Sequence, residues 1–517
     1  MPALKSAIMG KTRSVMWRYT NFLRSISVGL GLLGLFTLKA QTSAGLSTSS
    51  NYDVKTYGAV GDGATLDSPA INRAIEAASS KGGGTVWIPA GTYRSVSIRL
   101  RSNVVLFLDA GAVLMAANRD SGVGYDTAEP NPSNKYQDFG HTHFHNSLIW
   151  GENLENVSIL GRGRIWGKGL VRDFTKDVED GNKAISLRDC RNVTLRDFTI
   201  QHGGWFGILA TGVDHLTIDN LILDTNRDGM DIDCCRDVHV ANCSVNSPTD
   251  DGICLKSSLA LGYARPTENV TISNCLVSGF KEGSFLDGTF KREGHPVGRI
   301  KFGTESNGGF RNIAISNCLF DFSSGLALET VDGGLLEDVT ISNLAMRDIV
   351  NAPIFLRLGR RMRGPDGVPV GALRRVSISD VRVVGAREPS IISGVPGYPI
   401  EDITLKNFRI YSRGSTDPKL PNAEPIEDEK GYPEPGSLGK MPAQGFYIRH
   451  AKNIEFSDVE LRTDVDDPRS PVQLVDVDGA DFFQIKVPFA HHAAPFKLEN
   501  VRNFRARSVD VLSQQKS

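Results

Sequence analysis

Hydrophobic and polar positions alternate in short runs along this chain, and the same run returns about every 20–30 residues. Four examples are Asn156–Ile159, Asn192–Leu195, Asn269–Ile272 and Asn312–Ile315. An alternation with a period of two residues is typical of β-strands. No single run can bury its apolar side chains alone, so we expect copies stacked at about 4.8 Å per rung to share one core.

One helix-like segment precedes the repeat. Ser68-Pro69 suits a helix start, and the apolar residues that follow fall on one helical face: Ala70, Ile71, Ala74, Ile75 and Ala78. A helix in this position is expected to cover the open end of a stack of strands. We therefore predict an all-β fold, a right-handed single-stranded parallel β-helix with a short N-terminal capping helix.

The N-terminus has the pattern of an export signal. Basic residues precede an apolar run, Ile26–Leu38, that is shorter than the ~20 residues needed to cross a bilayer. An uncleaved anchor is the alternative. With cleavage after Ala44, residues 1–44 form a leader, 45–115 the cap and first coils, and 116–517 the catalytic β-helix, continuous with the cap. A secreted or periplasmic protein, not stably inserted in a membrane after removal of the leader, would follow.

Composition narrows the possible partners. A formal net charge of −1 gives no basis for nucleic-acid binding. The seven cysteines suit neither a disulfide framework nor a zinc site, and Cys243, Cys275 and Cys318 follow an asparagine at the same turn of the repeat. We expect these three in the core, and a monomer that uses no cofactor and no metal.

Three aspartates carry the candidate chemistry. Asp228 follows Asn226 and Arg227, and Asp250-Asp251 follows about one coil later. Superposing the two coils places the three carboxylates on neighbouring rungs. Carboxylates held this close repel one another, so the cluster lowers the stability of the fold unless it binds a metal or transfers protons. Asp-Gly pairs are also ordinary turn residues, but that explanation does not account for Asp250.

Here the chain resembles glycoside hydrolase family 28, the polygalacturonase family, from residue 57 to about residue 460. Asn226-x-Asp228 and Asp250-Asp251 match the family's Asn-Thr-Asp and Asp-Asp motifs in order and in neighbouring coils. The resemblance implies hydrolysis of a pectin-like polysaccharide with inversion at the anomeric carbon. It makes Asp250 the general acid, and gives Asp228 and Asp251 a joint role in activating water.

The chain departs from the family's motifs in two places. The family's Gly-His-Gly is replaced by an insertion with Gly294-His295-Pro296, and we expect His295 to act from a shifted position. The family's uronate-binding Arg-Ile-Lys appears one coil early, as Arg299-Ile300-Lys301, with Glu329 where its lysine belongs. Glu329 would repel a galacturonate there, and Arg299 and Lys301 would bind an anionic sugar nearby or form a solvated rung.

Further candidates lie beside the aspartates. Trp205 is one coil before Asp228 and could stack on a sugar ring or pack inside the coils. Asp231, Asp233 and Lys256 are predicted to face outward, either orienting the catalytic residues, contacting substrate or forming a surface ion pair. The residues His141, His143 and His145 would form a polar groove wall, a sugar subsite or a metal site.

Two segments interrupt the repeat. We expect the insertion from Lys281 to Pro296 to shape a groove, and residues 412–444 to do the same or to form a solvated bulge. Three alternatives to a polygalacturonase-like hydrolase stay open: a rhamnogalacturonan or rhamnoside hydrolase, a pectate-lyase-type eliminase with calcium and an arginine base, and a non-catalytic carbohydrate-binding β-helix.

Overall fold

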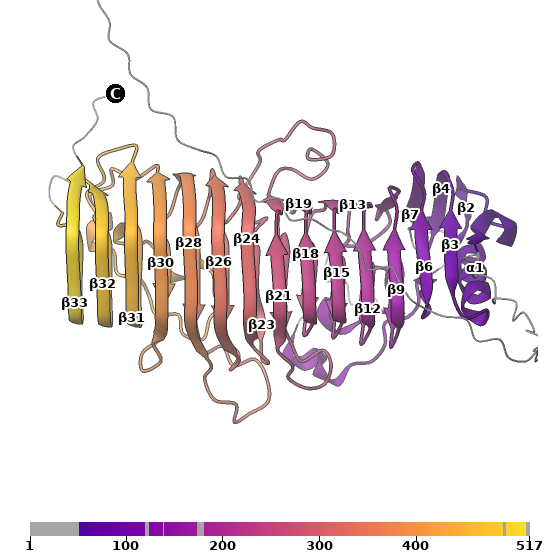
Figure 1. The fold of residues 1–517 in the computed structure, drawn as a ribbon, viewed down its shortest axis with the longest axis horizontal. Coiled ribbons are helices and arrows are strands. Elements are labelled where there is room, and N and C mark those ends of the chain that lie inside the picture. The colour runs from indigo at the N-terminus through magenta and orange to yellow at the C-terminus, as the bar shows by residue number, and fades with distance from the viewer. Residues whose placement is uncertain (1–50, 119–123, 138, 173–179, 490–492, 513–517) are drawn as a thin grey trace, which may run out of the picture. The chain divides into compact units, whose positions relative to one another are not determined.

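The strands of this protein stack as successive rungs of one long coil (Figure 1). The computed structural model describes residues 51–118, 124–137, 139–172, 180–489 and 493–512, all within a compact unit from Ser49 to Ser517. The strands pair in parallel with the strands of neighbouring coils, as expected for stacked repeats. The predicted right-handed parallel β-helix is confirmed. The predicted leader lies outside the described residues.

The coils have three faces. The first contains β1 (Asn51–Asp53), β3 (Gly84–Ile88), β6 (Val104–Leu108), β9 (Glu155–Leu160), β12 (Arg191–Arg196), β15 (Asp214–Asp219), β18 (Arg236–Ala241) and β21 (Thr267–Ser273). The second contains β2 (Asp62–Leu66), β4 (Gly91–Ser95), β7 (Ala112–Ala116), β10 (Arg164–Trp166), β13 (Thr199–Gln201), β16 (Ile222–Asp224), β19 (Ser244–Asn246) and β22 (Leu276–Ser278).

The third face holds the candidate site. It contains β5 (Ile98–Arg99), β8 (Ile149–Glu152), β11 (Lys183–Arg188), β14 (Phe206–Thr211), β17 (Asp228–Asp233), β20 (Ile253–Ser257), β23 (Ile300–Ser306), β25 (Leu326–Thr330), β27 (Ile354–Leu358) and β29 (Ser390–Ser393). Longer strands bend from one face to the next: β24 (Phe310–Asp321), β26 (Leu335–Arg347), β28 (Ala372–Ala386), β30 (Ile400–Ser412), β31 (Ala443–Thr463), β32 (Ser470–Pro488) and β33 (Phe496–Leu512).

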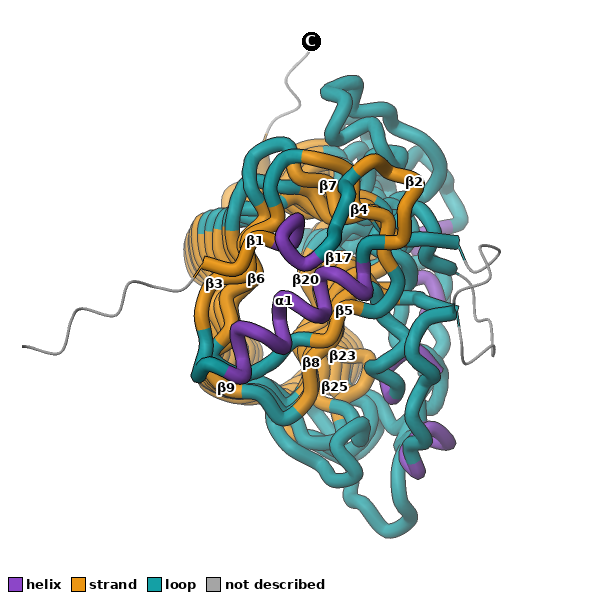
Figure 2. Tube along the Cα trace, turned by 90° about the vertical axis from the view of Figure 1, so that its right-hand side faces the viewer, coloured by secondary structure: helices purple, strands orange, loops and turns teal. Residues whose placement is uncertain are grey.

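The predicted capping helix is α1 (Ser68–Ser80). Its buried face contains the predicted alanines and isoleucines, and it lies across the first coil (Figure 2). Short 3-10 helices occur in the connections: Val54–Tyr57, Pro132–Tyr136, Phe139–Thr142, Leu420–Asn422 and Pro435–Leu438. No helix in the described part of the chain is both long and apolar enough to cross a membrane.

The core is built from residues in register. Val157, Val193, Leu216, Val238 and Val270 pair in sequence along the first face and are almost completely buried. Burying each such side chain stabilises the fold by about 1.5–3 kcal/mol. All seven cysteines are buried with free thiols, as expected for the three that follow an asparagine.

The repeated asparagines form a ladder at one turn. Asn274 donates to Asn242 (3.3 Å), Asn317 donates to Asn274 (3.2 Å) and Asn343 donates to Asn317 (2.7 Å). Each of these residues has a φ of 55–58°. Asparagine tolerates this left-handed conformation better than most residues, and its amide satisfies the next rung.

Two segments lie on the outer surface of the third face. In the first, residues 128–137 and 139–146, Phe144 packs with Trp205, Phe206, Leu209 and Ala260; we call it the N-side cover. In the second, residues 425–441, Leu438 and Met441 pack on Phe355, Ile391 and Tyr447; we call it the C-side cover. Long-range packing has therefore ordered part of the 412–444 segment against the coils, in agreement with the groove-shaping expectation.

Candidate active site

The structure brings the three aspartates together. Asp228 begins β17, and Asp250 and Asp251 lie in the turn before β20. Met230 pairs with Ile253, and the Gly229 amide donates to the Asp251 carbonyl (2.9 Å), so the two segments lie on adjacent rungs. One carboxylate oxygen from each aspartate lies within 4.8 Å of those of the other two.

Burial separates the roles that these carboxylates can play. The Asp250 side chain is 26% exposed, whereas Asp228 and Asp251 are 4% and 2% exposed. Burial, reinforced by Asp231 and Asp250, raises the pKa of Asp228 well above its ordinary value. Burial and the charge of Asp251 raise the pKa of Asp250. Two of the three groups therefore favour the protonated form more than an ordinary aspartate does.

Asp251 is the ionised member of the cluster. Burial alone would raise its pKa, but Lys301 and Arg299 outweigh that effect and lower the pKa of Asp251 to about 2. Arg299 Nε donates to Asp251 Oδ1 at 2.6 Å, and Lys301 Nζ lies 3.4 Å from Oδ2. The cluster thus contains an ionised carboxylate beside carboxyls that hold a proton more strongly, as acid–base chemistry requires.

Arg299 and Lys301 do not face an open sugar subsite. Their side chains are 3% and 1% exposed and are engaged with protein carboxylates. The solvated-rung alternative is wrong, because both side chains are buried. Direct contact with an anionic sugar stays a prediction that this burial does not favour. The reason is the C-side cover, whose Glu434 accepts from Arg299 at 3.1 and 2.5 Å and encloses both cations.

Glu329 is also buried instead of facing substrate. Its side chain is completely buried, with Lys301 Nζ 3.6 Å away. Burial raises the pKa of Glu329 to about 7, against the opposing effects of Lys301 and Arg299. The predicted repulsion of a galacturonate stays a prediction, and burial leaves Glu329 no direct contact with a sugar in this structure. Lys301 Nζ lies between Glu329 and Asp251, 3.6 Å from the first carboxylate and 3.4 Å from the second.

Beneath the cluster lies a second layer of buried charge. Asp231 and Lys256 point away from the coil core as predicted, but both are buried, so the predicted contact of Lys256 with substrate is not favoured. Lys256 Nζ donates to Glu305 (3.0 Å) and lies 3.8 Å from Asp231. His141 of the N-side cover is 3.5 Å from Asp231.

Asp233 does not form the predicted surface pair with Lys256. The two residues pair in strand register, but the buried Asp233 carboxylate accepts from the amide and hydroxyl of Ser258 (2.8 and 2.5 Å). The alternation of side chains along the strand correctly predicted that Asp233 points away from the coil core. The repeat contains no signal for the segment that covers this side of the strand.

Trp205 is a core residue. It is 1% exposed, stacks on Phe206 with ring centroids 5.8 Å apart, and lies under the Arg227 guanidinium at 4.9 Å. The ring packs between the N-side cover and the coils, not inside the coils as the alternative had it, and this burial leaves no ring face open to a sugar in the structure.

Each of the three clustered histidines has a different neighbour. His141 approaches Asp231, His143 Nδ1 contacts the Glu129 carbonyl (2.6 Å), and His145 Nε2 contacts Glu152 (2.9 Å) and stacks on Trp150. Their side chains therefore do not converge as a three-histidine metal site would.

His295 and Asn226 lie nearer to the open side. His295 is exposed on the 281–296 insertion and lines a pocket of about 430 Å³ that also contains Glu434. Among the described residues, no hydrogen bond or ion pair joins His295 to the three aspartates. Asn226 is half-buried in the turn before Asp228, where its carbonyl accepts from the Thr249 hydroxyl (2.7 Å).

Several site residues were not predicted. Arg227 donates to Asp250 at 2.6 Å, and its place inside the Asn-x-Asp motif was an available signal. Glu434 and Tyr432 come from the C-side cover, where the Tyr432 hydroxyl lies 3.1 Å from Lys301 Nζ. The sequence carries no local signal for these two, because the contacts join residues more than 130 positions apart.

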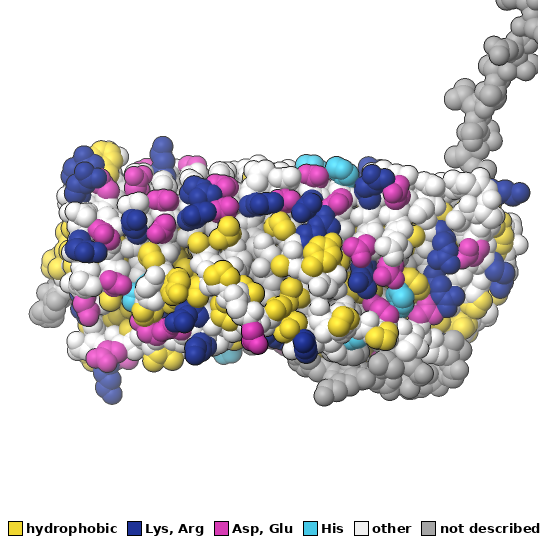
Figure 3. Space-filling model, turned by 90° about the horizontal axis from the view of Figure 1, so that it is seen from below, with side chains coloured by type: hydrophobic (Ala, Val, Ile, Leu, Met, Phe, Trp, Pro, Cys, Tyr) yellow, Lys and Arg dark blue, Asp and Glu magenta, His cyan; other side chains and the backbone are white. Residues whose placement is uncertain are grey.

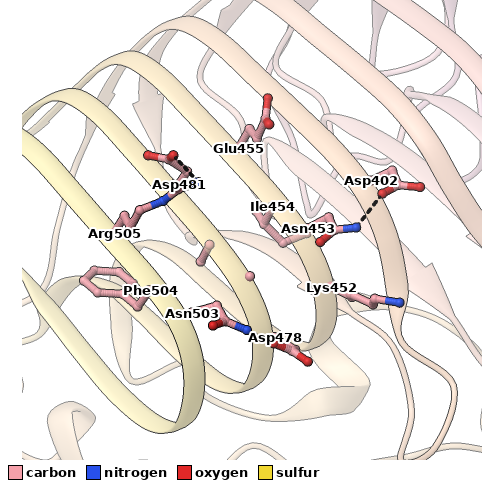
Figure 4. Close-up of a pocket in the computed structure, with 12 residues that line it drawn as sticks. Asp402, Lys452, Asn453, Ile454, Glu455, Asp478, Asp481, Asn503, Phe504 and Arg505 are labelled. Carbon is pink, nitrogen blue, oxygen red and sulfur yellow. Dashed lines mark hydrogen bonds and ion pairs between the residues drawn. The ribbon is translucent and has the colours of Figure 1, made fainter.

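A larger hollow of about 770 Å³ lies on the last coils, with a different character (Figure 4). Each of its three aspartates has a partner: Asp481 pairs with Arg505 (3.0 Å), Asp402 accepts from Asn453 (3.0 Å) and Asp478 accepts from Asn503 (2.8 Å). These contacts join neighbouring coils on the surface, and we assign the chemistry to the aspartate cluster.

Comparison with known proteins gives the same picture. Residues 52–281 match the family model described as rhamnogalacturonase A/epimerase, pectate lyase-like. A probable polygalacturonase of Vitis vinifera is 23% identical over 421 residues, covering 75% of this chain and 80% of that protein. An exo-poly-alpha-D-galacturonosidase of Dickeya chrysanthemi is 24% identical over 364 residues, covering 59% of this chain and 56% of that enzyme.

A solved structure shares the fold. The family 28 exopolygalacturonase of Yersinia enterocolitica superposes with a TM-score of 0.60 at 19% identity, covering 84% of this chain and 78% of that one. The resemblance drawn from the aspartate motifs is confirmed. This chain is similar in sequence to polygalacturonases and shares the fold of a family 28 exopolygalacturonase.

Proposed function

We propose that this protein is a glycoside hydrolase that cleaves glycosidic bonds in pectic polysaccharide, with Asp250 as the general acid. The expectation of a polygalacturonase-like glycosidase is confirmed at the level of the enzyme class by its polygalacturonase relatives. The roles of individual residues rest on the site itself. The observation that carries them is the division of the cluster into one ionised carboxylate, Asp251, and two with raised pKa values.

The reaction follows from these protonation states. Asp250, the most exposed of the three, donates its proton to the glycosidic oxygen as the bond from that oxygen to the anomeric carbon breaks. Water attacks the anomeric carbon and gives up a proton to Asp251. Asp228 holds this water by a hydrogen bond. Positioned general acids and bases contribute about 10²–10⁴-fold each to such reactions.

We propose inversion at the anomeric carbon because neither buried aspartate is free to attack it. Asp251 is held by Arg299 and Lys301, and Asp228 is 4% exposed. The nearest oxygens of the cluster are closer than the roughly 6.5–9.5 Å between acid and base in many inverting enzymes. We place the water between Asp228 and Asp251, so that it attacks the anomeric carbon from the side opposite the leaving oxygen that Asp250 protonates.

The same ion pairs argue against a calcium-dependent eliminase. The three aspartates could supply oxygen ligands to a cation. However, Arg227 already pairs with Asp250, and Arg299 and Lys301 pair with Asp251. A divalent ion at this site would lie beside three fixed positive charges, which would oppose its binding.

The family model also names a rhamnogalacturonase, so a rhamnogalacturonan linkage is the second candidate substrate. Because pectic polysaccharides are polymers, we propose that the enzyme is exported through the predicted leader to reach them. We propose that the enzyme works as a monomer.

The test compares the wild type with Asp250→Asn on homogalacturonan, rhamnogalacturonan and aryl rhamnosides. We expect reducing ends without ultraviolet absorbance, and a loss of about 10²–10⁴-fold in the variant. Absorbance from unsaturated sugars would replace the hydrolase by an eliminase. Binding with no turnover on any substrate would support a non-catalytic carbohydrate-binding protein.

A further inference from the structure

One column of side chains runs along the third face of the β-helix from β14 to β31. It runs through Leu209, Asp231, Cys254, Lys301, Ala327, Phe355, Ile391 and Tyr447, which pair in register. None of these eight side chains is more than 3% exposed. A polysaccharide laid along this face would find no open surface over these coils.

The N-side cover closes the face before the aspartates. Besides the packing of Phe144, it is tied to the following coils by two hydrogen bonds. Asn131 Nδ2 donates to the Ala260 carbonyl (2.8 Å), and the Leu259 amide donates to Gln137 Oε1 (3.3 Å). This cover therefore bridges the coils on both sides of Asp228.

The C-side cover closes the face after them. Two buried arginines hold its backbone: Arg357 donates to the Glu427 carbonyl (2.7 Å), and Arg449 donates to the Ile426 carbonyl (2.6 Å). Glu434 adds the ion pair with Arg299. A buried arginine that is bonded to backbone carbonyls fixes a loop more firmly than exposed contacts do.

Asp250 is the most exposed of the three aspartates, and its backbone adjoins the rungs that lead to a pocket. The Gly298 amide donates to the Asp250 carbonyl, and the Ser324 amide donates to the Val297 carbonyl. The segments around Val297 and Ser324 therefore lie on the two rungs that follow Asp250. Val297, Ser324 and Asn351 line the pocket of about 430 Å³, between the insertion and the C-side cover. This volume is at the low end of small-ligand sites and suits a short saccharide.

We infer that the enzyme acts on chain ends: the pocket beside Asp250 receives the terminal sugars of a pectic chain, and the two covers prevent binding in the middle of a polymer. This inference rests on the proposed function and adds its mode of action. Cleavage then releases short products one step at a time, because each cut needs a free end in the pocket.

The experiment follows reducing ends, viscosity and product size together during digestion of polymeric homogalacturonan and rhamnogalacturonan by the wild type. We expect mono- or disaccharides from the first time point, with little loss of viscosity per bond cleaved. A broad ladder of oligosaccharides with a rapid fall in viscosity would overturn the inference while leaving the proposed function intact. Absence of hydrolysis on every substrate would overturn both.

Substrates with blocked ends provide a test that needs no variant. Oligosaccharides are reduced with borohydride at one end, or carry an unsaturated sugar at the other. We expect one of the two modifications to slow hydrolysis at least tenfold. Equal rates on both modified substrates and on the unmodified one would contradict a chain-end pocket.

A matched pair of variants tests the cover. Leu438 is 1% exposed on the underside of the C-side cover, and Ile426 is 58% exposed on the same segment. We expect Leu438→Asn to loosen the cover and to raise the viscosity loss per bond several-fold, whereas Ile426→Asn leaves it unchanged. Identical behaviour of the two folded variants and the wild type would count against the cover as the barrier.

Discussion

At the scale of the residue, the central feature is a set of carboxylates whose pKa values are separated by their neighbours. The sequence predicted the three aspartates, because they lie in short motifs in adjacent coils. It could not predict Glu434 or Tyr432, which reach Arg299 and Lys301 from a distant loop. Trp205 was placed in the correct coil, but its burial depends on the N-side cover.

The ion pair between Arg227 and Asp250 predicts a pH effect. Arg227 lowers the pKa of Asp250, against the larger effect of burial. Arg227→Gln should therefore raise that pKa, so the general acid keeps its proton to higher pH. We expect the alkaline limb of the kcat/KM profile to move upward by about one pH unit.

The control for that shift is Arg191→Gln, which removes a surface arginine paired with Glu155 (2.7 Å). Its profile should match the wild type. An unchanged or downward-shifted alkaline limb in Arg227→Gln would show that Asp250 is not the acid titrating there.

Glu329 predicts how stability changes with pH. Its folded-state pKa of about 7 is above the ordinary 4.5, so the folded protein binds the proton more strongly. The resulting stability is present below pH 4.5 and is lost as the pH rises through 7, by up to about 3 kcal/mol. Glu329→Gln should lose less unfolding free energy than the wild type between pH 5 and 8 in urea titrations. Parallel curves would contradict this.

Trp205 predicts a loss of stability. Because the ring is buried against Phe206, Trp205→Ala should lower the free energy of unfolding by about 3–5 kcal/mol. The half-buried Trp166 is the comparison, with a smaller expected loss. A stable Trp205→Ala protein with a raised KM alone would restore the tryptophan as a sugar platform.

At the scale of the element, the repeats were predictable and the covers were not. Alternating runs such as Asn269–Ile272 indicate strands, and the recurring asparagines indicate where the coil turns. These signals are local and are repeated in every coil. The covers carry no repeat, and residues 425–441 resemble a solvated loop in composition. Their order comes from Arg357, Arg449 and an apolar underside.

The ion pair between Arg299 and Glu434 predicts the behaviour of the C-side cover. Glu434→Gln removes the charge that holds the cover to the catalytic coil, so limited proteolysis between residues 425 and 441 should be several-fold faster. Glu429→Gln, at a more exposed pair with Arg360, is the matched control. Equal cleavage rates would show that the apolar contacts alone hold this segment.

At the scale of the whole β-helical body, the rigid stack places the site partway along its length. Seen from below, hydrophobic side chains gather in the middle of the body, with charged side chains on either side (Figure 3). The coils position Asp228 and Asp251 through register, and the loops decide what can reach them. This division explains how related β-helices keep one fold while their loops differ.

The most direct test of the account is proton NMR of the first product formed from a pectic oligosaccharide. It should use the wild type beside Asp250→Asn, before mutarotation mixes the anomers. We predict a new reducing end with the anomeric configuration opposite to that of the bond cleaved, and none from the variant. A product of retained configuration, or a vinyl proton from elimination, would contradict hydrolysis by water held between Asp228 and Asp251.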